Sequence, residues 1–379
     1  MLIPLALLAP TLVPQTVAPT TEPSALPRVT FVEKVMLLPG APVSFATAPL
    51  DGGPVPDLAL VTISQVGSSY SSRLWVLEGL GDGTFQDAYV TGLGTQYSNG
   101  HTMRVVDFDA DGWNDVSVPG YLSNGGLRFG DGTLVYDDPL YVPTVGGDRA
   151  DHAFADYTGD GLLDALSLVR DLGGYFVDTA ENDGNGGFTN LQFTDVAPYD
   201  TFHAHLVTAD FDGGGLESDC AVTSSFGIEL VDYPAFSSPI FAQGGPYGQA
   251  ESADVDGDGD ADLFATRTDT KGLESLLNDG AGNLTAASFA PLGERAEHVS
   301  LADMDLDGDL DAVATASDSD TVRIVWNDGL GGLRAAAPFP VGNFPTLVSL
   351  SDLDLDGDVD AVVANVLDKT LSVLLSTRH

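Results

Sequence analysis

The sequence DVDGDGDAD at residues 254–262 has close variants at four other places in the chain. These variants are DFDADGWND at 107–115, DYTGDGLLD at 156–164, DMDLDGDLD at 303–311 and DLDLDGDVD at 352–360. So many carboxylates within nine residues are unfavourable unless a cation neutralises them, and oxygen ligands at alternate positions suit a hard ion, above all Ca²⁺. The glycine at the sixth position permits the sharp turn that would close each loop around an ion.

The spacing of these loops indicates the architecture. Their first aspartates lie at 107, 156, 254, 303 and 352, so the steps are 49, 98, 49 and 49 residues. Because 98 is twice 49, a worn copy is expected between the second and third loops, and DFDGGGLESD at 210–219 fits it. A further worn copy, DGGPVPD, lies at 51–57. The chain therefore holds seven units, and a period near 50 residues is typical of a propeller or solenoid.

Each unit predicts four short strands and no helix. An alternating segment precedes the loop, an apolar run such as DAVAT at 311–315 follows it, and a third segment such as TVRIVW at 321–326 ends in an Asn-Asp-Gly hairpin turn. We therefore predict an all-β fold, a seven-bladed β-propeller of four-stranded blades over residues 29–379. The last unit stops after its third strand, at Ser376. We expect an N-terminal strand at about 29–37 to complete this blade and close the ring.

The repeated loops resemble the FG-GAP/VCBS repeat family, the propeller repeats related to the integrin α-chain head, and the resemblance covers about residues 29–379. It implies that each acidic loop joins the first two strands of a blade. It also implies that side chains at loop positions 1, 3, 5 and 9 and a backbone carbonyl near position 7 bind Ca²⁺. About five calcium ions are expected, with the ligands Asp107, Asp109, Asp111 and Asp115; Asp156, Thr158, Asp160 and Asp164; Asp254, Asp256, Asp258 and Asp262; Asp303, Asp305, Asp307 and Asp311; and Asp352, Asp354, Asp356 and Asp360.

The two worn loops depart from this pattern. Asp210 and Asp212 are expected to form a weak site, and the loop at 51–57 is not expected to bind metal. An EF-hand is excluded because its loop ends in a glutamate at position twelve. That position holds Val118, Ser167, Ala265, Ala314 and Val363 here. Solvated acidic turns without an ion remain the alternative.

The composition favours an exported protein that does not bind nucleic acid. There are 56 acidic and 14 basic residues, and a formal net charge of −42 repels phosphates and anionic membranes. The single cysteine, Cys220, allows no intrachain disulfide. Residues 1–28 are interpreted as a short apolar, signal-like segment followed by a Pro/Thr-rich linker, too short to span a membrane. We expect a secreted or otherwise extracytoplasmic monomer without membrane insertion.

Five of the six histidines lie four to seven residues before the first aspartate of their unit: His101, His152, His203, His205 and His298. Arg149, Arg295 and Tyr247 lie in the same zone, which should form the rim opposite the acidic loops, around the central channel. Three interpretations stay open: packing at a crowded rim, a pocket that binds a sugar or peptide, and a catalytic or transition-metal site.

Repeats fill the chain, and it lacks G-x-S-x-G, H-E-x-x-H and phosphate-binding glycine motifs. We therefore expect a calcium-binding, non-catalytic module for adhesion to an extracellular protein or glycan, with no catalytic residue assigned. The alternative is a carbohydrate-active enzyme, similar to polysaccharide lyases with propellers, that uses the His- and Arg-bearing rim near the central channel.

Overall fold

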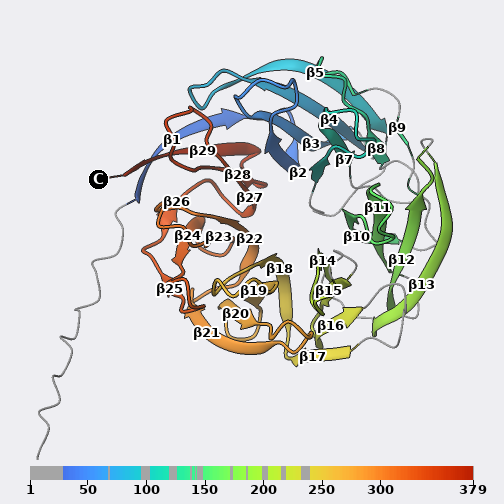
Figure 1. Ribbon diagram of the computed structural model, residues 1–379. Helices are drawn as coiled ribbons and strands as arrows, with labels where there is room; N and C mark the ends of the chain where they lie inside the picture. Colours follow the sequence, from blue (N-terminus) through green and yellow to red (C-terminus); the bar gives the residue numbers. More distant parts are fainter. Residues whose placement is uncertain are drawn as a thin grey trace, which may run out of the picture.

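The computed structural model describes residues 29–66, 69–94, 103–118, 126–136, 139–140, 142, 148–170, 174–184, 187–198, 204–214, 219–231 and 240–378. In these residues every regular element is a β-strand, and the strands form seven sheets arranged in a ring (Figure 1). The predicted all-β, seven-bladed propeller is therefore confirmed. The predicted signal-like segment and linker at 1–28 lie outside the described residues, as do His101 and His203.

The first four blades follow the chain from the inside of the ring outward. They are blade 1 with β2 (Ala41–Ala48), β3 (Asp57–Val66), β4 (Ser69–Gly79) and β5 (Phe85–Gly94); blade 2 with β6 (Arg104–Val106), β7 (Asp115–Val118), β8 (Gly126–Arg128) and β9 (Pro139–Leu140); blade 3 with β10 (Asp148–Ala155), β11 (Asp164–Arg170), β12 (Gly174–Asn182) and β13 (Phe188–Pro198); and blade 4 with β14 (His205–Ala209), β15 (Asp219–Thr223), β16 (Gly227–Val231) and β17 (Ile240–Gly244).

The remaining blades use the same antiparallel meander. They are blade 5 with β18 (Tyr247–Ala253), β19 (Asp262–Arg267), β20 (Gly272–Leu277) and β21 (Thr285–Pro291); blade 6 with β22 (Ala296–Ala302), β23 (Asp311–Ala316), β24 (Thr321–Trp326), β25 (Arg334–Ala335) and β26 (Phe339–Pro340); and blade 7 with β27 (Pro345–Ser351), β28 (Asp360–Asn365), β29 (Thr370–Arg378) and β1 (Val29–Leu37).

The outer strand of blade 6 is split, because β25 and β26 each pair with β24. Pro338 lies between them and has no N–H to give to the ladder, which accounts for the break.

The two ends of the chain meet in blade 7. β1 pairs antiparallel with β29 over nine residues, from Val29 opposite Arg378 to Leu37 opposite Thr370. The rings of Phe31 and Phe339 stand edge to face at 5.3 Å, so β1 also contacts blade 6. Ser372 Oγ donates a hydrogen bond of 2.6 Å to Glu33 Oε1. Blade 7 therefore joins both ends of the described chain in one sheet.

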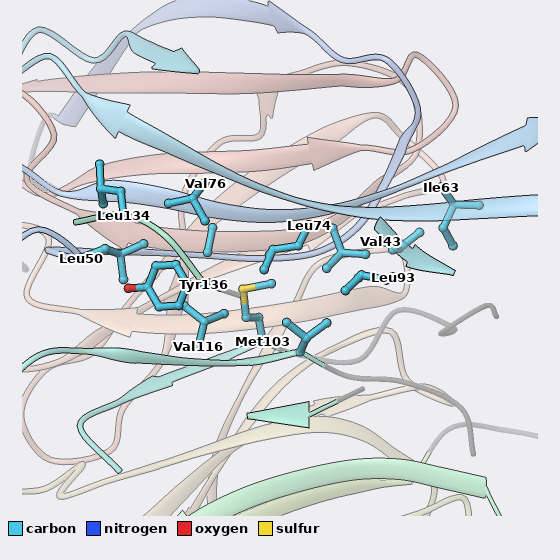
Figure 2. Close-up of a cluster of buried hydrophobic side chains, with 13 residues drawn as sticks. Val43, Leu50, Ile63, Leu74, Val76, Leu93, Met103, Val116, Leu134 and Tyr136 are labelled. Carbon is cyan, nitrogen blue, oxygen red and sulfur yellow. The ribbon is translucent and has the colours of Figure 1, made fainter. Parts of the chain in front are cut away.

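The strands after the acidic loops are apolar throughout because both faces of each blade pack on neighbours. All six residues of β23 are buried, and they alternate between two cores. Ala312 and Ala314 pack with blade 5, whereas Val313 packs with blade 7. Figure 2 shows the equivalent core between blades 1 and 2, where Leu74 and Val116 are fully buried.

Hydrogen bonds link the innermost strands of neighbouring blades; apart from β6, which is unlabelled, their labels lie nearest the centre in Figure 1. From β6 round to β2, they are Arg104 Nε to the His152 carbonyl (3.3 Å), Leu206 N to Asp151 Oδ2 (3.1 Å), Ser252 Oγ to the Thr208 carbonyl (3.3 Å), Gln249 Nε2 with His298 Nε2 (3.4 Å), Ser300 Oγ to the Val348 carbonyl (2.9 Å) and Thr47 Oγ1 with Ser349 Oγ (2.7 Å). Polar side chains near the axis therefore hold the blades in register.

Removal of β1 tests the stabilising role of the N-terminal strand. A chain that begins at Pro39 should unfold at a lower temperature than one that begins at Val29, because β29 loses a nine-residue partner and presents an open edge. Differential scanning calorimetry measures the difference, and size-exclusion chromatography should show self-association of the shorter chain only. Equal melting temperatures for the two chains would contradict the role given to β1.

Candidate metal centres and the axial polar cluster

All seven acidic loops, worn copies included, connect the first strand of a blade to its second and so lie on one rim of the ring. In five of them three aspartates place one carboxylate oxygen each within 4.8 Å of the others, close enough to share one ion. These groups are Asp107, Asp109 and Asp115; Asp210, Asp212 and Asp219; Asp254, Asp256 and Asp262; Asp303, Asp305 and Asp311; and Asp352, Asp354 and Asp356.

The donor set fits a hard cation such as Ca²⁺, because every donor in these groups is a carboxylate oxygen. Oδ1 of Asp354 is buried and, among the described residues, has no hydrogen-bond partner. A buried, unpaired carboxylate oxygen is costly unless a cation meets it. In three of the motif loops the aspartates at positions 1, 3 and 9 are thus brought together, whereas in the loop at 352–360 the group is made by positions 1, 3 and 5.

Two loops differ from the sequence-based expectation in detail. Asp219 groups with Asp210 and Asp212 although sequence reasoning left it out of the ligand set, because an inserted residue moves it from position 9 to position 10. The loop at 156–164 forms no such group of three carboxylates in the described chain, since Thr158 supplies a hydroxyl at position 3. The worn loop at 210–219 therefore brings three carboxylates together, whereas the sequence-based expectation had two.

The backbone of each loop is wound around its own carboxylates. Asp303 accepts the N–H of Asp307 at Oδ1 (3.1 Å) and the N–H of Gly308 at Oδ2 (3.0 Å). Gly308 has φ of 101°, a conformation that glycine adopts without strain, so the sixth position performs the turn predicted for it. Leu306 also has a positive φ, 58°, and is an exposed side chain.

The last aspartate of each loop is buried and accepts hydrogen bonds from the backbone. The seven side chains are at most 2% exposed: Asp57, Asp115, Asp164, Asp219, Asp262, Asp311 and Asp360. Asp311 accepts the N–H of Met304 at Oδ2 (3.2 Å) and the N–H of Asn327 at Oδ1 (2.9 Å), so one carboxylate connects the loop, the second strand and the end of the third. Burial, with help from nearby loop carboxylates, raises the pKa of Asp311 to about 7. A cation in the loop would oppose that rise, because it favours the charged form.

The predicted rim residues separate into three places. His152 packs between blades 2 and 3, where its Nε2 lies 2.5 Å from Ser117 Oγ and its ring stands edge-on to Phe154. His205 and His298 lie near the axis with Asp151, whose Oδ2 is 3.5 Å from His205 Nδ1. Arg149 lies in β10 opposite Val169, and the position of its side chain is not described.

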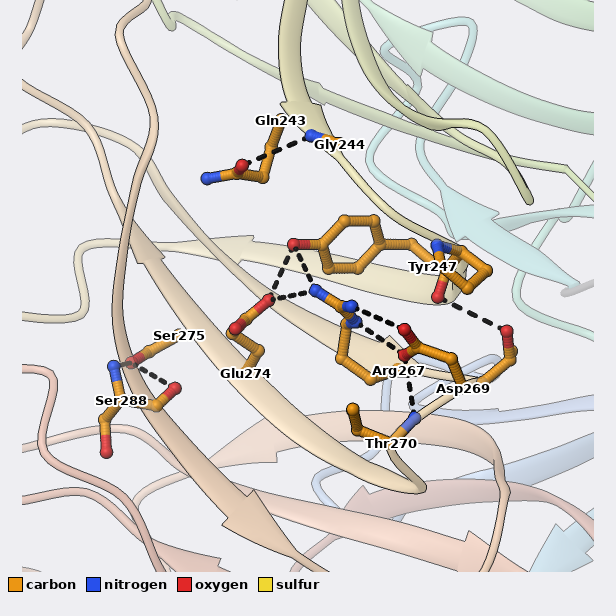
Figure 3. A network of polar contacts seen from close by, with 11 residues as sticks. Gln243, Gly244, Tyr247, Arg267, Asp269, Thr270, Glu274, Ser275 and Ser288 are labelled. Carbon is orange, nitrogen blue, oxygen red and sulfur yellow. Dashed lines mark hydrogen bonds and ion pairs between the residues drawn. The ribbon is translucent and has the colours of Figure 1, made fainter.

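Tyr247 and Arg295 belong to the rim opposite the loops, and carboxylates of their own blades bind them. Tyr247 is buried and donates a hydrogen bond of 2.6 Å to Glu274. The guanidinium of Arg267 lies between this pair and Asp269. Its Nη1 is 3.2 Å from Glu274 Oε2, and its Nη2 is 2.8 Å from Asp269 Oδ2 (Figure 3). Arg295 pairs with Glu297. These contacts hold the strand ends at this rim.

The axial cluster consists of Arg104, Asp151, His205, Glu251 and His298, whose charges act on one another across the channel. Burial lowers the pKa of His298 to about 3, and the positive charge of Arg104 adds to this, so His298 is neutral. Burial raises the pKa of Glu251. Burial would also raise the pKa of Asp151, but its hydrogen bond with His205 and the charge of Arg104 outweigh burial and lower it. The cluster therefore combines a cation, two acids and two imidazoles.

Residues 254–314 match a family model described as FG-GAP-like repeat. They span blade 5 from its acidic loop onward and blade 6 into β23, so the matched segment contains two complete loops. The match and the seven-bladed ring together support an FG-GAP repeat β-propeller. No curated protein matches the chain. No helix among the described residues is long and apolar enough to cross a membrane.

Trp113 should report ion binding by its fluorescence. It occupies position 7 of the first motif loop, is 36% exposed, and its ring lies so close to Gly52 that a Cβ added there would come within 2.4 Å. Titration of Ca²⁺ into chelator-treated protein should change the emission in a saturable way, because Trp113 belongs to the loop that an ion would order. Trp113→Phe should abolish this change while calcium still raises the melting temperature. A change that persists in Trp113→Phe would contradict the assignment.

Two substitutions distinguish the hydrogen bonds between the last aspartate and the backbone from metal binding by the loop. Asp57→Ala removes hydrogen bonds to Leu50 (2.9 Å) and Gly79 (2.9 Å) in a loop not expected to hold metal. It should cost about 2–4 kcal/mol in the free energy of unfolding, equally with and without chelator. Asp303→Ala should destabilise strongly in calcium and much less in chelator. Asp51→Ala, in the same loop as Asp57, is the control with a small effect. Calcium dependence of the Asp57→Ala effect would overturn this division.

Proposed function

We propose that this FG-GAP repeat β-propeller is an exported, calcium-stapled binding module that attaches to an extracellular protein or glycan and catalyses no reaction. The observation that carries the proposal is the set of five carboxylate groups along one rim, each with three oxygens within 4.8 Å. Ca²⁺ would neutralise these carboxylates and hold the ends of the first and second strands together. Extracellular Ca²⁺ is abundant enough to fill even weak sites of this kind, and FG-GAP repeats are typical of extracellular proteins.

The net charge and the closed ring support further parts of the proposal. A formal charge of −42 opposes binding to nucleic acid and to anionic membranes, so the partner is a neutral or cationic surface. The blades pack on one another around the ring, and β1 pairs with β29 in blade 7. This packing supports a monomer without membrane insertion. Repeats fill the described chain, and the side chains of Tyr247 and Arg295 at the rim are bound by neighbouring carboxylates. Both observations support a module that catalyses no reaction.

The second candidate function is a carbohydrate-active enzyme that works near the axis. The contact between His205 and Asp151 favours it, since an acid beside an imidazole orients a general base. His205→Ala should abolish any turnover of polysaccharide while the melting temperature stays close to that of the native protein. Formation of new reducing ends or unsaturated products by the native protein, lost in this variant, would replace the binding proposal with the enzymatic one.

Chelation should lower the unfolding temperature sharply. Ions that bind only the folded state stabilise it by mass action, about 2.7 kcal/mol for each site at a calcium concentration one hundred times its dissociation constant. Calorimetry in calcium and in EGTA measures the shift, and elemental analysis after dialysis should find about five Ca²⁺ per chain. A melting temperature indifferent to EGTA would contradict the calcium assignment.

Retention on defined surfaces tests the binding role. Calcium-loaded protein is applied to an array of glycans and to immobilised extracellular-matrix proteins, with EGTA buffer in parallel. Retention on at least one surface is expected in calcium and should fall in EGTA. Asp309→Asn, which changes a half-buried loop side chain outside the three-oxygen groups, is the matched control. Absence of retention on every surface in calcium would overturn the proposal.

A further inference from the structure

Two adjoining cavities lie along the axis next to the acidic loops. One has a volume of about 180 Å³ and the other about 400 Å³, and both are lined by Glu251 and Ser252 of β18. The smaller also contacts Arg104, and the larger contacts Ser300 and Ser349. Each of Arg104, Glu251, Ser300 and Ser349 stands three residues before the first aspartate of its loop, so together they form one layer of the channel wall.

The next layer inward holds polar side chains that are mostly buried. Residues five before the loop lie on the same face of each strand as residues three before it, because side chains alternate with a period of two. In blades 3 to 6 this layer holds Asp151, His205, Gln249 and His298, and all but the half-buried His205 are at most 5% exposed. Gln249 contacts both Glu251 (2.9 Å) and His298 (3.4 Å). None of these four residues lines either cavity, so they form a polar layer of the channel beyond the cavities.

The mouth of the cavities faces the rim of acidic loops. Leu310, in the loop of blade 6, lines the larger cavity. Arg104, Glu251, Ser300 and Ser349 are all half-buried rather than fully enclosed, so solvent reaches them. A space of about 400 Å³ falls within the range of roughly 300–1,000 Å³ typical of small-molecule sites.

The lining offers unused hydrogen-bonding capacity of both kinds. Arg104 donates Nε to the His152 carbonyl, and in the described part of the chain no carboxylate lies within 4.0 Å of its guanidinium. Glu251 supplies acceptor oxygens, while Phe154 and Val207 give the smaller cavity an apolar wall. A donor, an acceptor and an apolar surface around one space suit a ligand that carries several hydroxyl groups on a carbon ring.

Two other ligand classes fit less well. The carboxylates and imidazoles here are not among the groups of three donors within 4.8 Å found in the described chain, so a transition metal has no ready site. An anionic ligand must approach a protein of net charge −42. A neutral ligand meets neither obstacle.

We propose that this axial cavity binds the terminal sugar residue of a neutral glycan, with Arg104 and Glu251 as its hydrogen-bonding poles. The inference rests on the proposed binding function and places its ligand on the calcium side of the ring. A cavity enclosed by first strands, with a polar layer of the channel beyond it, receives the end of a chain, not its middle.

Ligand-observed saturation-transfer NMR with methyl glycosides of neutral hexoses and of fucose tests the proposal, because these probes mimic a chain end. The calcium-loaded native protein should transfer saturation to at least one glycoside. Glu251→Gln and Arg104→Met should each weaken its affinity at least tenfold. Ser300→Leu should also abolish transfer, because it fills the larger cavity without changing a charge. Calorimetry of each variant shows whether it is folded.

Glu297→Gln is the matched control, since Glu297 is a first-strand carboxylate of blade 6 that pairs with Arg295 outside the cavity lining. It should bind the glycoside as the native protein does. Binding that is lost in Glu297→Gln but kept in the folded variants Glu251→Gln, Arg104→Met and Ser300→Leu would place the sugar on the opposite rim. That result overturns this inference and leaves the binding function standing. Absence of transfer from every glycoside to native protein also overturns it, and retention on matrix proteins then decides the wider proposal.

Discussion

A buried carboxylate at the end of each acidic loop is the interaction on which the rest of this structure depends. It accepts backbone N–H groups from the loop and, in six blades, from the end of the third strand, as Asp57, Asp164 and Asp360 illustrate. These donors lie where the chain leaves regular pairing, so without the carboxylate they would be buried and unsatisfied. That explains why both worn units keep this aspartate although they have lost other acids of the motif.

The same carboxylate creates the need for a cation. A charge that is almost completely buried is expensive, and burial raises the pKa of Asp115, Asp262 and Asp360 to about 6. Aspartates at positions 3 and 5 of the loop add repulsion unless an ion lies between them. Clamping of the backbone and binding of metal are therefore two consequences of one buried acid. Blade 1 shows that the first persists where the ligands for the second are missing, because Asp57 is clamped like the others.

Much of the fold followed from the sequence because a period near 49 residues and alternating apolar runs leave few architectures open. The gathering of aspartates within each loop was also accessible, because the acids repeat at fixed positions of the motif. The full ligand sets stay a prediction. The histidines were not. Counted from their loops, His152 lies four residues before the first aspartate, whereas His205 and His298 lie five before it. A difference of one position along a strand places the side chain on the opposite face of the sheet. His152 therefore packs between blades, and the other two reach the axis.

Sequence reasoning also missed partners that come from separate strands. Tyr247 begins β18, while Arg267 ends β19 and Glu274 belongs to β20, and only the pairing of these strands brings the three together. The cavity beside Glu251 was hidden for the same reason. Its walls take two or three residues from each of several blades, so no local pattern marks it.

The side chains near the axis differ in chemical character from one group of blades to the other. Blades 2 to 6 supply Arg104, Asp151, His205, Glu251 and His298, while the other side carries small neutral groups such as Ser44, Thr47 and Ser349. A ring that needed polar contacts only to hold the blades in register could use small hydroxyl side chains throughout, such as Thr47 and Ser349, whose oxygens are 2.7 Å apart. Charged groups in a half-buried channel cost more to place there. Because Arg104 and Glu251 stand three residues before Asp107 and Asp254, the strands that end in the acidic loops also fix the cavity walls. An ion bound in a loop would therefore also order the cavity beside it, so the acidic rim and the axial cavity would act as one structural unit.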